Sequence, residues 1–360
     1  MTRPEDSQTW KEITAQPQIW SQWGPPLAKR AAEIRDWIAR LQIEEIVFAG
    51  AGSSAFIGDI LSFAASGRLR LRASPTTDLV SCPFEGLRDD PRLLVAQFGR
   101  SGDSPESVGA LDLLDSLFPR AQRLNITCNP SGALATERAV GPGAQQVIVL
   151  PSATHDSGFA MTSSFTTMLL SAMACLDPEV DVAARLEGLS QRAAALIETL
   201  VKRTPARPDR AVFLGSGALK GVARECALKV LELTAGQTVT CWDSTLGFRH
   251  GPKAVINGKD LVVAMIHPDS LTARYDADVA AEIRSQFPVA TVLTLGGAGA
   301  DIVVGEVSDA RWDAALYVLA AQVWATAWSG ALGLNIDNPF VDKGNLSRVV
   351  SGVTLYPVSQ

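Results

Sequence analysis

The sequence predicts an α/β fold in which parallel sheets carry helices on both faces, and three observations support this prediction. Short apolar runs alternate with segments of helical spacing, which is typical of parallel strands buried on both faces. The alternation restarts after a proline-rich linker at residues 203–208, so the chain contains two such units. The strand at residues 211–217 ends in glycines, as does the first strand at residues 46–52, which indicates an internal duplication.

The first unit follows an irregular arm and an amphipathic helix that we expect at about residues 26–41. Its strands are short and apolar, and we expect them at residues 46–50, 93–98, 124–127 and 146–150. Helices should follow them at residues 54–65, 104–117 and 161–174, with one more from the third strand through residue 133. A long helix at about residues 182–201 leads into the linker.

The second unit repeats this pattern and is followed by a tail. Its strands are expected at residues 211–217, 261–266, 290–295 and 302–307. The tail is rich in Asn, Asp, Pro and Gly and should be irregular, although several apolar side chains give it reason to dock: Val349, Val350, Val353, Leu355 and Tyr356. The expected division of the chain is therefore 1–42, 43–202, 208–334 and 335–360.

The composition of the 360 residues excludes several classes of protein. A net charge of −6 disfavours a nucleic-acid partner held by a basic surface. Five scattered cysteines form no CxxC pair and no zinc spacing, and the first residues lack the apolar core of a signal peptide, so a cytoplasmic protein is expected. Residues 314–332 are strongly apolar, but Gln322, Thr326 and Ser329 interrupt them, which favours a helix in a core or dimer interface over a membrane span.

One turn carries the strongest functional signal. The apolar strand at residues 93–98 runs into Gly99-Arg100-Ser101-Gly102-Asp103-Ser104, and a helix opens there with Pro105 in its first turn. Such a turn leaves unpaired backbone N–H groups, reinforced by serine hydroxyls, above the end of the strand. Because a helix N-terminus also favours negative charge, the turn is predicted to bind an anion, and phosphate is the usual occupant.

A second turn, Gly50-Ala51-Gly52-Ser53-Ser54, lies at the end of the first strand. It lacks the third glycine of a dinucleotide fingerprint, and the chain has no Walker-type phosphate loop. Each serine could act merely as a helix cap. Two serine-bearing turns at the carboxyl ends of parallel strands nevertheless favour a shared phosphate cradle. The corresponding strand of the second unit runs into His267-Pro268 without a glycine, so that unit should supply the chemistry instead.

Proton-transfer candidates lie in the second unit. His250 stands in a glycine-flanked loop at residues 243–253, which favours a functional histidine over a merely solvated one. His155 could line the mouth of the crevice, and His267 is expected to be structural. On the helix at residues 224–232, three charged residues share one face: Glu225, Lys229 and Glu232. They could form a solvated salt-bridged stripe or a partly buried carboxylate suited to proton transfer.

These residues resemble those of the tandem SIS (sugar isomerase) domain family. The turn at residues 101–104, with Glu232 and Arg249-His250-Gly251-Pro252, is similar to the isomerase half of glucosamine-6-phosphate synthase. The segments 75–80, 158–165 and 242–253 resemble the branch of tagatose-6-phosphate ketose/aldose isomerases and galactosamine-6-phosphate deaminases, and the similarity extends over about residues 10–358. It implies two flavodoxin-like (SIS) three-layer α/β/α domains with parallel sheets, the first binding phosphate and the tail covering the active site.

The resemblance also implies roles for individual residues. Phosphate-binding positions fall on Gly52, Ser53, Ser54, Arg100, Ser101 and Ser104. Glu232 matches the proton-shuttling glutamate, and His250 matches a ring-opening histidine that the neighbouring subunit supplies. The family's imine-forming lysine is replaced by Arg348, which stays protonated and forms no imine. Lys343 could take that lysine's place.

The function implied is the isomerisation of a 6-phospho sugar, with ammonia released when the sugar carries a 2-amino group. The resemblance implies a homodimer with shared active sites and no cofactor or metal. Two alternatives stay open: a simple tagatose-6-phosphate isomerase, and a phosphosugar-sensing protein that binds without catalysis.

Overall fold

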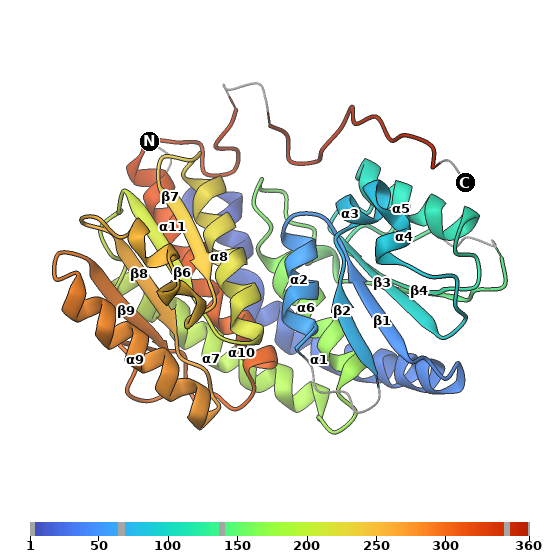
Figure 1. Cartoon of the computed structure of the whole chain (residues 1–360), viewed down its shortest axis with the longest axis horizontal. Helices are drawn as coiled ribbons and strands as arrows, with labels where there is room; N and C mark the ends of the chain where they lie inside the picture. The colour runs from blue at the N-terminus through green and yellow to red at the C-terminus, as the bar shows by residue number, and fades with distance from the viewer. Residues whose placement is uncertain (1–3, 64–68, 137–140, 342–345, 359–360) are drawn as a thin grey trace.

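The computed structural model describes residues 4–63, 69–136, 141–341 and 346–358, and it contains two parallel five-stranded sheets side by side (Figure 1). The first sheet has the order β2-β1-β3-β4-β5. Its strands are β1 (Glu45–Ala49), β2 (Arg70–Ala73), β3 (Leu93–Gly99), β4 (Gln122–Thr127) and β5 (Gln145–Val149). One face of this sheet is covered by α3 (Thr76–Ser81), α4 (Pro83–Gly86) and α5 (Pro105–Ser116). The other face is covered by α2 (Ser53–Leu61) and α6 (Ser163–Leu176), which pack toward the centre of the molecule.

The second sheet has the order β10-β9-β8-β6-β7. Counted from β7, this strand order is the same as that of the first sheet counted from β2. Its strands are β6 (Arg210–Leu214), β7 (Val239–Asp243), β8 (Leu261–Met265), β9 (Thr291–Gly296) and β10 (Ile302–Val303). Its helices are α8 (Ala218–Leu233), α9 (Ser270–Gln286), α10 (Ala310–Tyr317) and α11 (Leu319–Ala331). Short 3-10 helices complete the chain: η1 (Pro4–Asp6), η2 (Ser152–Thr154), η3 (Gly247–Arg249) and η4 (Pro252–Val255).

The internal duplication extends to the backbone of the glycine turns. Gly52 has φ 57° and ψ −130°, and Gly217, at the same place in the second unit, has φ 56° and ψ −128°. Only glycine adopts this conformation without strain. The strand order is that of the flavodoxin-like fold. The expected fold class is therefore confirmed.

The expected irregular arm is wrong, because residues 8–40 form one helix, α1 (Gln8–Arg40). Pro17, Pro25 and Pro26 lie inside it and disfavour a helix locally. Tertiary packing overrides them: Trp20, Leu27 and other side chains of one face are fully buried against α6 and α7 (Val182–Lys202).

Three further expectations differ from the structure. Residues 128–136, which follow β4, form turns where a helix was expected, and Asp103 accepts a hydrogen bond from the Ala133 N–H there. The strand expected at residues 302–307 is shorter in the structure, where it is β10 at residues 302–303. Gly305 follows it with a φ of 104°, which is not a strand conformation. Edge strands β2 and β7 were not expected. The predicted end of α2 at residue 65 lies outside the described residues.

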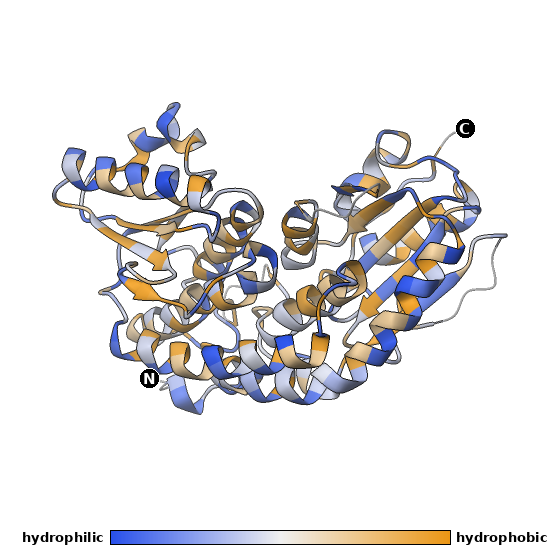
Figure 2. Cartoon of the chain, turned by 90° about the horizontal axis from the view of Figure 1, so that it is seen from below, coloured by the Kyte–Doolittle hydropathy of each residue, from blue (hydrophilic) through white to orange (hydrophobic). Residues whose placement is uncertain are grey.

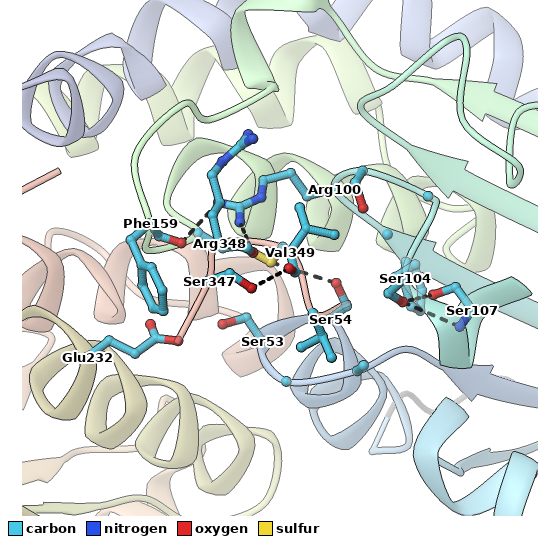
Figure 3. Close-up of a pocket in the computed structure, with 18 of the residues that line it drawn as sticks. Ser53, Ser54, Arg100, Ser104, Ser107, Phe159, Glu232, Ser347, Arg348 and Val349 are labelled. Atoms are coloured by element: carbon cyan, nitrogen blue, oxygen red, sulfur yellow. Dashed lines mark hydrogen bonds between the residues drawn. The ribbon is translucent and has the colours of Figure 1, made fainter. Parts of the chain in front are cut away.

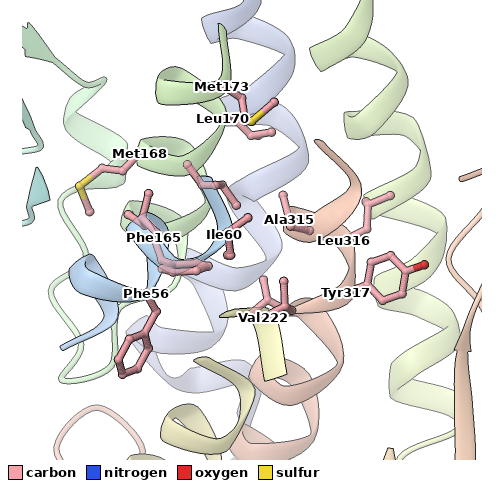
Figure 4. Packing of buried hydrophobic residues seen from close by; sticks show 14 of the residues in the cluster. Phe56, Ile60, Phe165, Met168, Leu170, Met173, Val222, Ala315, Leu316 and Tyr317 are labelled. Atoms are coloured by element: carbon pink, nitrogen blue, oxygen red, sulfur yellow. The ribbon is translucent and has the colours of Figure 1, made fainter. Parts of the chain in front are cut away.

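One apolar core joins the two units. Phe56 and Ile60 of α2, Phe165 of α6, Val222 of α8 and Leu316 of α10 meet between the sheets (Figure 4). The apolar segment at residues 314–332 contributes Trp324 and Trp328 to this core, as expected. The limits given above for the individual domains stay a prediction.

The surface pattern agrees with this layering. Seen from below, the strands are mostly hydrophobic, and many helices are hydrophilic along one side only (Figure 2). Within the described residues, no helix combines the length and the apolar character that crossing a membrane requires.

Candidate active site

The site lies where β1 and β3 lie side by side at the centre of the first sheet. Connections from these two strands leave in opposite directions, which opens a crevice beyond their carboxyl ends. Both predicted turns stand at this point. Gly50 is required there because a side chain would meet the backbone of Ser54 at 2.6 Å, and Gly102 has a φ of 73°.

A cavity of about 270 Å³ opens between these turns, α8 and the tail (Figure 3). It brings together eight of the ten predicted site residues: Gly52, Ser53, Ser54, Arg100, Ser101, Ser104, Glu232 and Arg348. Residues 346–350 of the tail form its cover, which we call the roof segment. Phe159 and Met161 supply an apolar wall.

The serines of the two turns differ in how they are engaged. Ser104 caps α5, because its Oγ accepts a hydrogen bond from the Ser107 N–H at 3.3 Å, and it lines the cavity as well. Ser53 Oγ donates to Glu225 at 3.1 Å. Among the residues that the structure describes, Ser54 Oγ has only the Met161 sulfur within reach, at 3.8 Å. Because that contact is weak, the Ser54 hydroxyl can donate to an anion in the cavity.

Arg100 is buried, with 7% of its surface exposed. Its Nη1 donates to the carbonyl oxygens of Gly158 and Phe159 at 3.0 and 3.1 Å, and its Nη2 donates to that of Arg348 at 3.0 Å. Burial lowers the pKa of Arg100, and the neighbouring Arg348 lowers it further. The guanidinium nevertheless stays protonated and makes this end of the cavity positive.

The three charged residues of α8 form a buried cluster. The side chains of Glu225 and Lys229 are 0% exposed, and that of Glu232 is 22% exposed where it reaches the cavity. Lys229 Nζ lies 3.5 Å from Glu225 Oε1 and 2.5 Å from Glu232 Oε2. A solvated stripe is therefore wrong, because the side chains of Glu225 and Lys229 are buried. That this face is suited to proton transfer stays a prediction.

Burial and the neighbouring charges together set the pKa values in this cluster. It raises the pKa of Glu225 to about 7, although Lys229 opposes the rise. Burial by itself lowers the pKa of Lys229, but the two carboxylates outweigh it and raise that pKa overall. The lysine is thus a fixed positive charge against the carboxylate that faces the cavity.

The structure places the remaining candidates elsewhere. His250 is exposed on the loop between η3 and η4 and does not line the cavity. Lys343 lies outside the described residues. Arg348 lines the cavity, but its guanidinium is turned to the carbonyl oxygens of Gly158, at 3.2 Å, and Asp156. Burial lowers the pKa of the half-buried His155, and Arg348 lowers it further. His267 accepts a hydrogen bond from the Asp269 N–H in its own turn, which agrees with a structural role.

Sequence reasoning missed the loop that forms the cavity wall. Asp156 is buried at the N-terminus of α6, where it accepts hydrogen bonds from the backbone N–H groups and hydroxyls of Thr162, Ser163 and Ser164. This bonding orders the segment that carries Phe159. The signal for it was the run of three hydroxyl residues at the start of a helix, Thr162 as its N-cap and Ser163 and Ser164 in its first turn.

The twin turn of the second sheet is closed to anions. Ser216, which follows the first glycine of that turn, donates to the fully buried carboxylate of Asp276 at 2.6 Å. The same carboxylate accepts the His267 N–H at 3.0 Å. A buried carboxylate repels phosphate, so this turn of the second unit is not suited to bind it.

Two flavodoxin-like units in tandem, with a cavity at the strand ends of the first, define the class of tandem sugar-isomerase (SIS) proteins, and comparisons with known proteins agree. An AgaS protein of Streptomyces coelicolor is 41% identical, covering 98% of this chain and 96% of its own. D-galactosamine-6-phosphate deaminase AgaS of Escherichia coli is 37% identical, covering 97% and 96%. Tagatose-6-phosphate ketose/aldose isomerase from Escherichia coli has a similar crystal structure, with a TM-score of 0.87 at 34% identity over 99% and 98% of the two chains. No protein-family model matches the sequence.

The chain belongs to the AgaS family of SIS-type phosphosugar isomerases and deaminases.

Proposed function

We propose that the protein converts a 6-phospho amino sugar of the galactosamine 6-phosphate type to a ketose 6-phosphate and ammonia. One observation carries this proposal: a single cavity joins two glycine- and serine-rich turns to the partly exposed carboxylate of Glu232. The relatives named above support the substrate class. The chemistry below is derived for that class.

The phosphoryl group would sit at the first sheet. The turns leave backbone N–H groups at the N-termini of α2 and α5, and both helices favour negative charge there. Ser54, Ser101 and Ser104 add hydroxyl donors. Because the protein as a whole is negative, this local set of donors must attract the anion.

Glu232 would be the general base. It would remove the proton from C2 of the open-chain sugar and return a proton to C1 through a cis-enediol or an enolamine. Lys229 holds the carboxylate at 2.5 Å and so fixes its orientation. A base that is held in place in this way can move a proton between adjacent carbons without leaving the sugar.

Ammonia release follows from the same proton shift. When C2 carries an amine, proton return at C1 gives an imine at C2. Water adds to this imine to give a carbinolamine, the C–N bond breaks, and ammonia leaves with both protons of the water while the water oxygen becomes the C2 carbonyl. When C2 carries a hydroxyl, the product is a ketose and nothing leaves.

His250 would open the sugar ring by proton transfer to the ring oxygen, from a second copy of the chain. It is exposed and outside the cavity of its own chain, which supports a homodimer with shared active sites. We place the enzyme in the cytoplasm, because a doubly charged sugar phosphate does not cross a bilayer unaided.

The test is a panel of substrates offered to the purified full chain, with ammonia and ketose measured together. Galactosamine 6-phosphate should give equal amounts of ammonia and ketose phosphate, faster than glucosamine 6-phosphate, and Glu232→Gln should give neither. Turnover of tagatose 6-phosphate without any ammonia from the amino sugars would instead establish a simple isomerase. Tight binding without any turnover would establish a sensor.

A further inference from the structure

Two arginines that line the cavity meet there, and the guanidinium of each donates to backbone carbonyls. Arg100, at the end of β3, donates to the carbonyls of Gly158, Phe159 and Arg348. Arg348, in the roof segment, donates to Gly158 and Asp156. Both therefore share the Gly158 carbonyl, and Figure 3 shows the two side chains together on the same side of the cavity.

These bonds join three parts of the chain that are far apart in the sequence. Arg100 belongs to the turn after β3, residues 156–159 lead to Phe159 in the cavity wall, and Arg348 belongs to the roof segment. The hydrogen bonds from Arg100 to Gly158 and Arg348 span 58 and 248 residues. Elsewhere the tail is lightly held: Val350, Val353, Leu355 and Tyr356 are 50%, 40%, 39% and 81% exposed. Arg100 is thus a buried charged anchor for an otherwise exposed tail.

The arrangement fits a fork-shaped donor. A guanidinium presents several N–H groups in one plane and can serve three carbonyl oxygens at once, whereas an ammonium is a single compact charge. The two like charges repel, and the carboxylates of Asp156 and Glu232 lie close enough to offset part of this repulsion. Five hydrogen bonds to the carbonyls of Asp156, Gly158, Phe159 and Arg348 stabilise this pairing.

We propose that Arg100 and Arg348 form a clasp that holds the roof segment over the substrate, so that Arg100 acts as a positioning residue and its guanidinium is not the phosphate ligand. Only the kinetic consequence of this inference rests on the proposed function. Its structural consequence, a roof held by Arg100, can be tested without any turnover.

The first measurement is hydrogen–deuterium exchange of peptides from residues 346–358 in the full chain. Arg100→Met keeps the length of the side chain but removes every donor, and we expect exchange of the roof amides at least tenfold faster than in the wild type. Arg100→Lys should not restore protection, because one ammonium cannot serve three carbonyls. Arg92→Met is the matched control, because Arg92 lies just before β3 with a half-exposed side chain paired to Glu44.

The second measurement is the affinity for inorganic phosphate, which probes the turn without needing a roof. It should stay within threefold in Arg100→Met, while kcat/KM for the amino sugar falls at least tenfold. A tenfold loss of phosphate affinity would make the guanidinium a phosphate ligand and overturn the clasp. Unchanged exchange of the roof amides would overturn it too.

Arg348→Met tests the same clasp from the other side and remains informative if Arg100→Met does not fold. The clasp predicts faster roof exchange and a lower kcat/KM in this variant as well. A fall in kcat with roof exchange unchanged would give Arg348 a role in the chemistry and would contradict the proposal. If no variant or wild type turns over any sugar, the proposed function fails, but the exchange result still decides the clasp.

Discussion

Lys229 Nζ lies 2.5 Å from Glu232 Oε2, and the lysine side chain is 0% exposed while the glutamate reaches the cavity. The buried end of this pair is closed by Glu225, whose Oε1 lies 3.5 Å from the same nitrogen. One lysine therefore balances two carboxylates, and the cluster is a fixed support for a base that faces the substrate. The first predictions follow from this arrangement.

Lys229→Met should destabilise the fold strongly, because it leaves two carboxylates without their cation. Removing one partner of a buried ion pair costs about 3–5 kcal/mol. Urea denaturation measures this loss. Lys202→Met is the control, since Lys202 and Glu198 also form a pair one helical turn apart, but both side chains are 76% exposed. That change should cost about 0.5 kcal/mol or less. Equal losses in the two variants would contradict a structural role for the Lys229 cluster.

Glu232→Gln should abolish turnover while leaving substrate binding nearly intact. The amide keeps the size of the carboxylate and a hydrogen-bonding oxygen for Lys229, but it cannot accept the C2 proton. One positioned acid or base contributes about 10²–10⁴ in rate, so kcat should fall by at least ~100-fold. Steady-state kinetics and isothermal titration with the sugar phosphate measure the two quantities separately. A variant that keeps most of its kcat would exclude Glu232 as the base.

Stability should depend on pH through Glu225. Burial raises its pKa to about 7 in the fold, from an ordinary value of 4.5. Between these two values the folded protein holds a proton that the unfolded chain has released. Stability therefore falls as pH rises from 4.5 to 7, by about 3 kcal/mol, and levels off above 7.

The wild type compared with Glu225→Gln isolates this contribution, because the amide does not titrate. The free energy of unfolding, measured at pH 5 and pH 8, should fall more in the wild type than in the variant. Parallel pH profiles would mean that Glu225 titrates normally in the fold.

The turn at residues 99–104, which lines the cavity, could be identified from the sequence because its signal is local. The strand that ends in Gly99, the serines of the turn and Pro105 at the start of α5 lie within a few residues of one another, and each has a direct physical meaning. The same holds for the shared face of Glu225, Lys229 and Glu232, which follows from helical spacing alone. Burial of that face could not be predicted, because α2 supplies Ser53 as a partner from 172 residues away.

The long-range parts of the fold were the ones that sequence reasoning missed. Three prolines within α1 disfavour a helix when the sequence is read alone. Its packing against α6 and α7 explains why a helix forms there. Edge strand β2 carries arginines at residues 70 and 72 and lacks the apolar run of a central strand. The orientation of Arg100 depends on carbonyls at residues 158, 159 and 348, and no local pattern predicts it.

Two inactive variants should restore activity to each other if His250 acts on the partner's cavity. In a mixed dimer of Glu232→Gln with His250→Asn, one cavity combines both defects and the other combines two intact residues. Random mixing after dissociation makes half of the dimers mixed, so about a quarter of wild-type activity should return. Each variant refolded alone is the control. If His250 served its own chain, every cavity of the mixed dimer would keep one defect, and mixing would restore nothing.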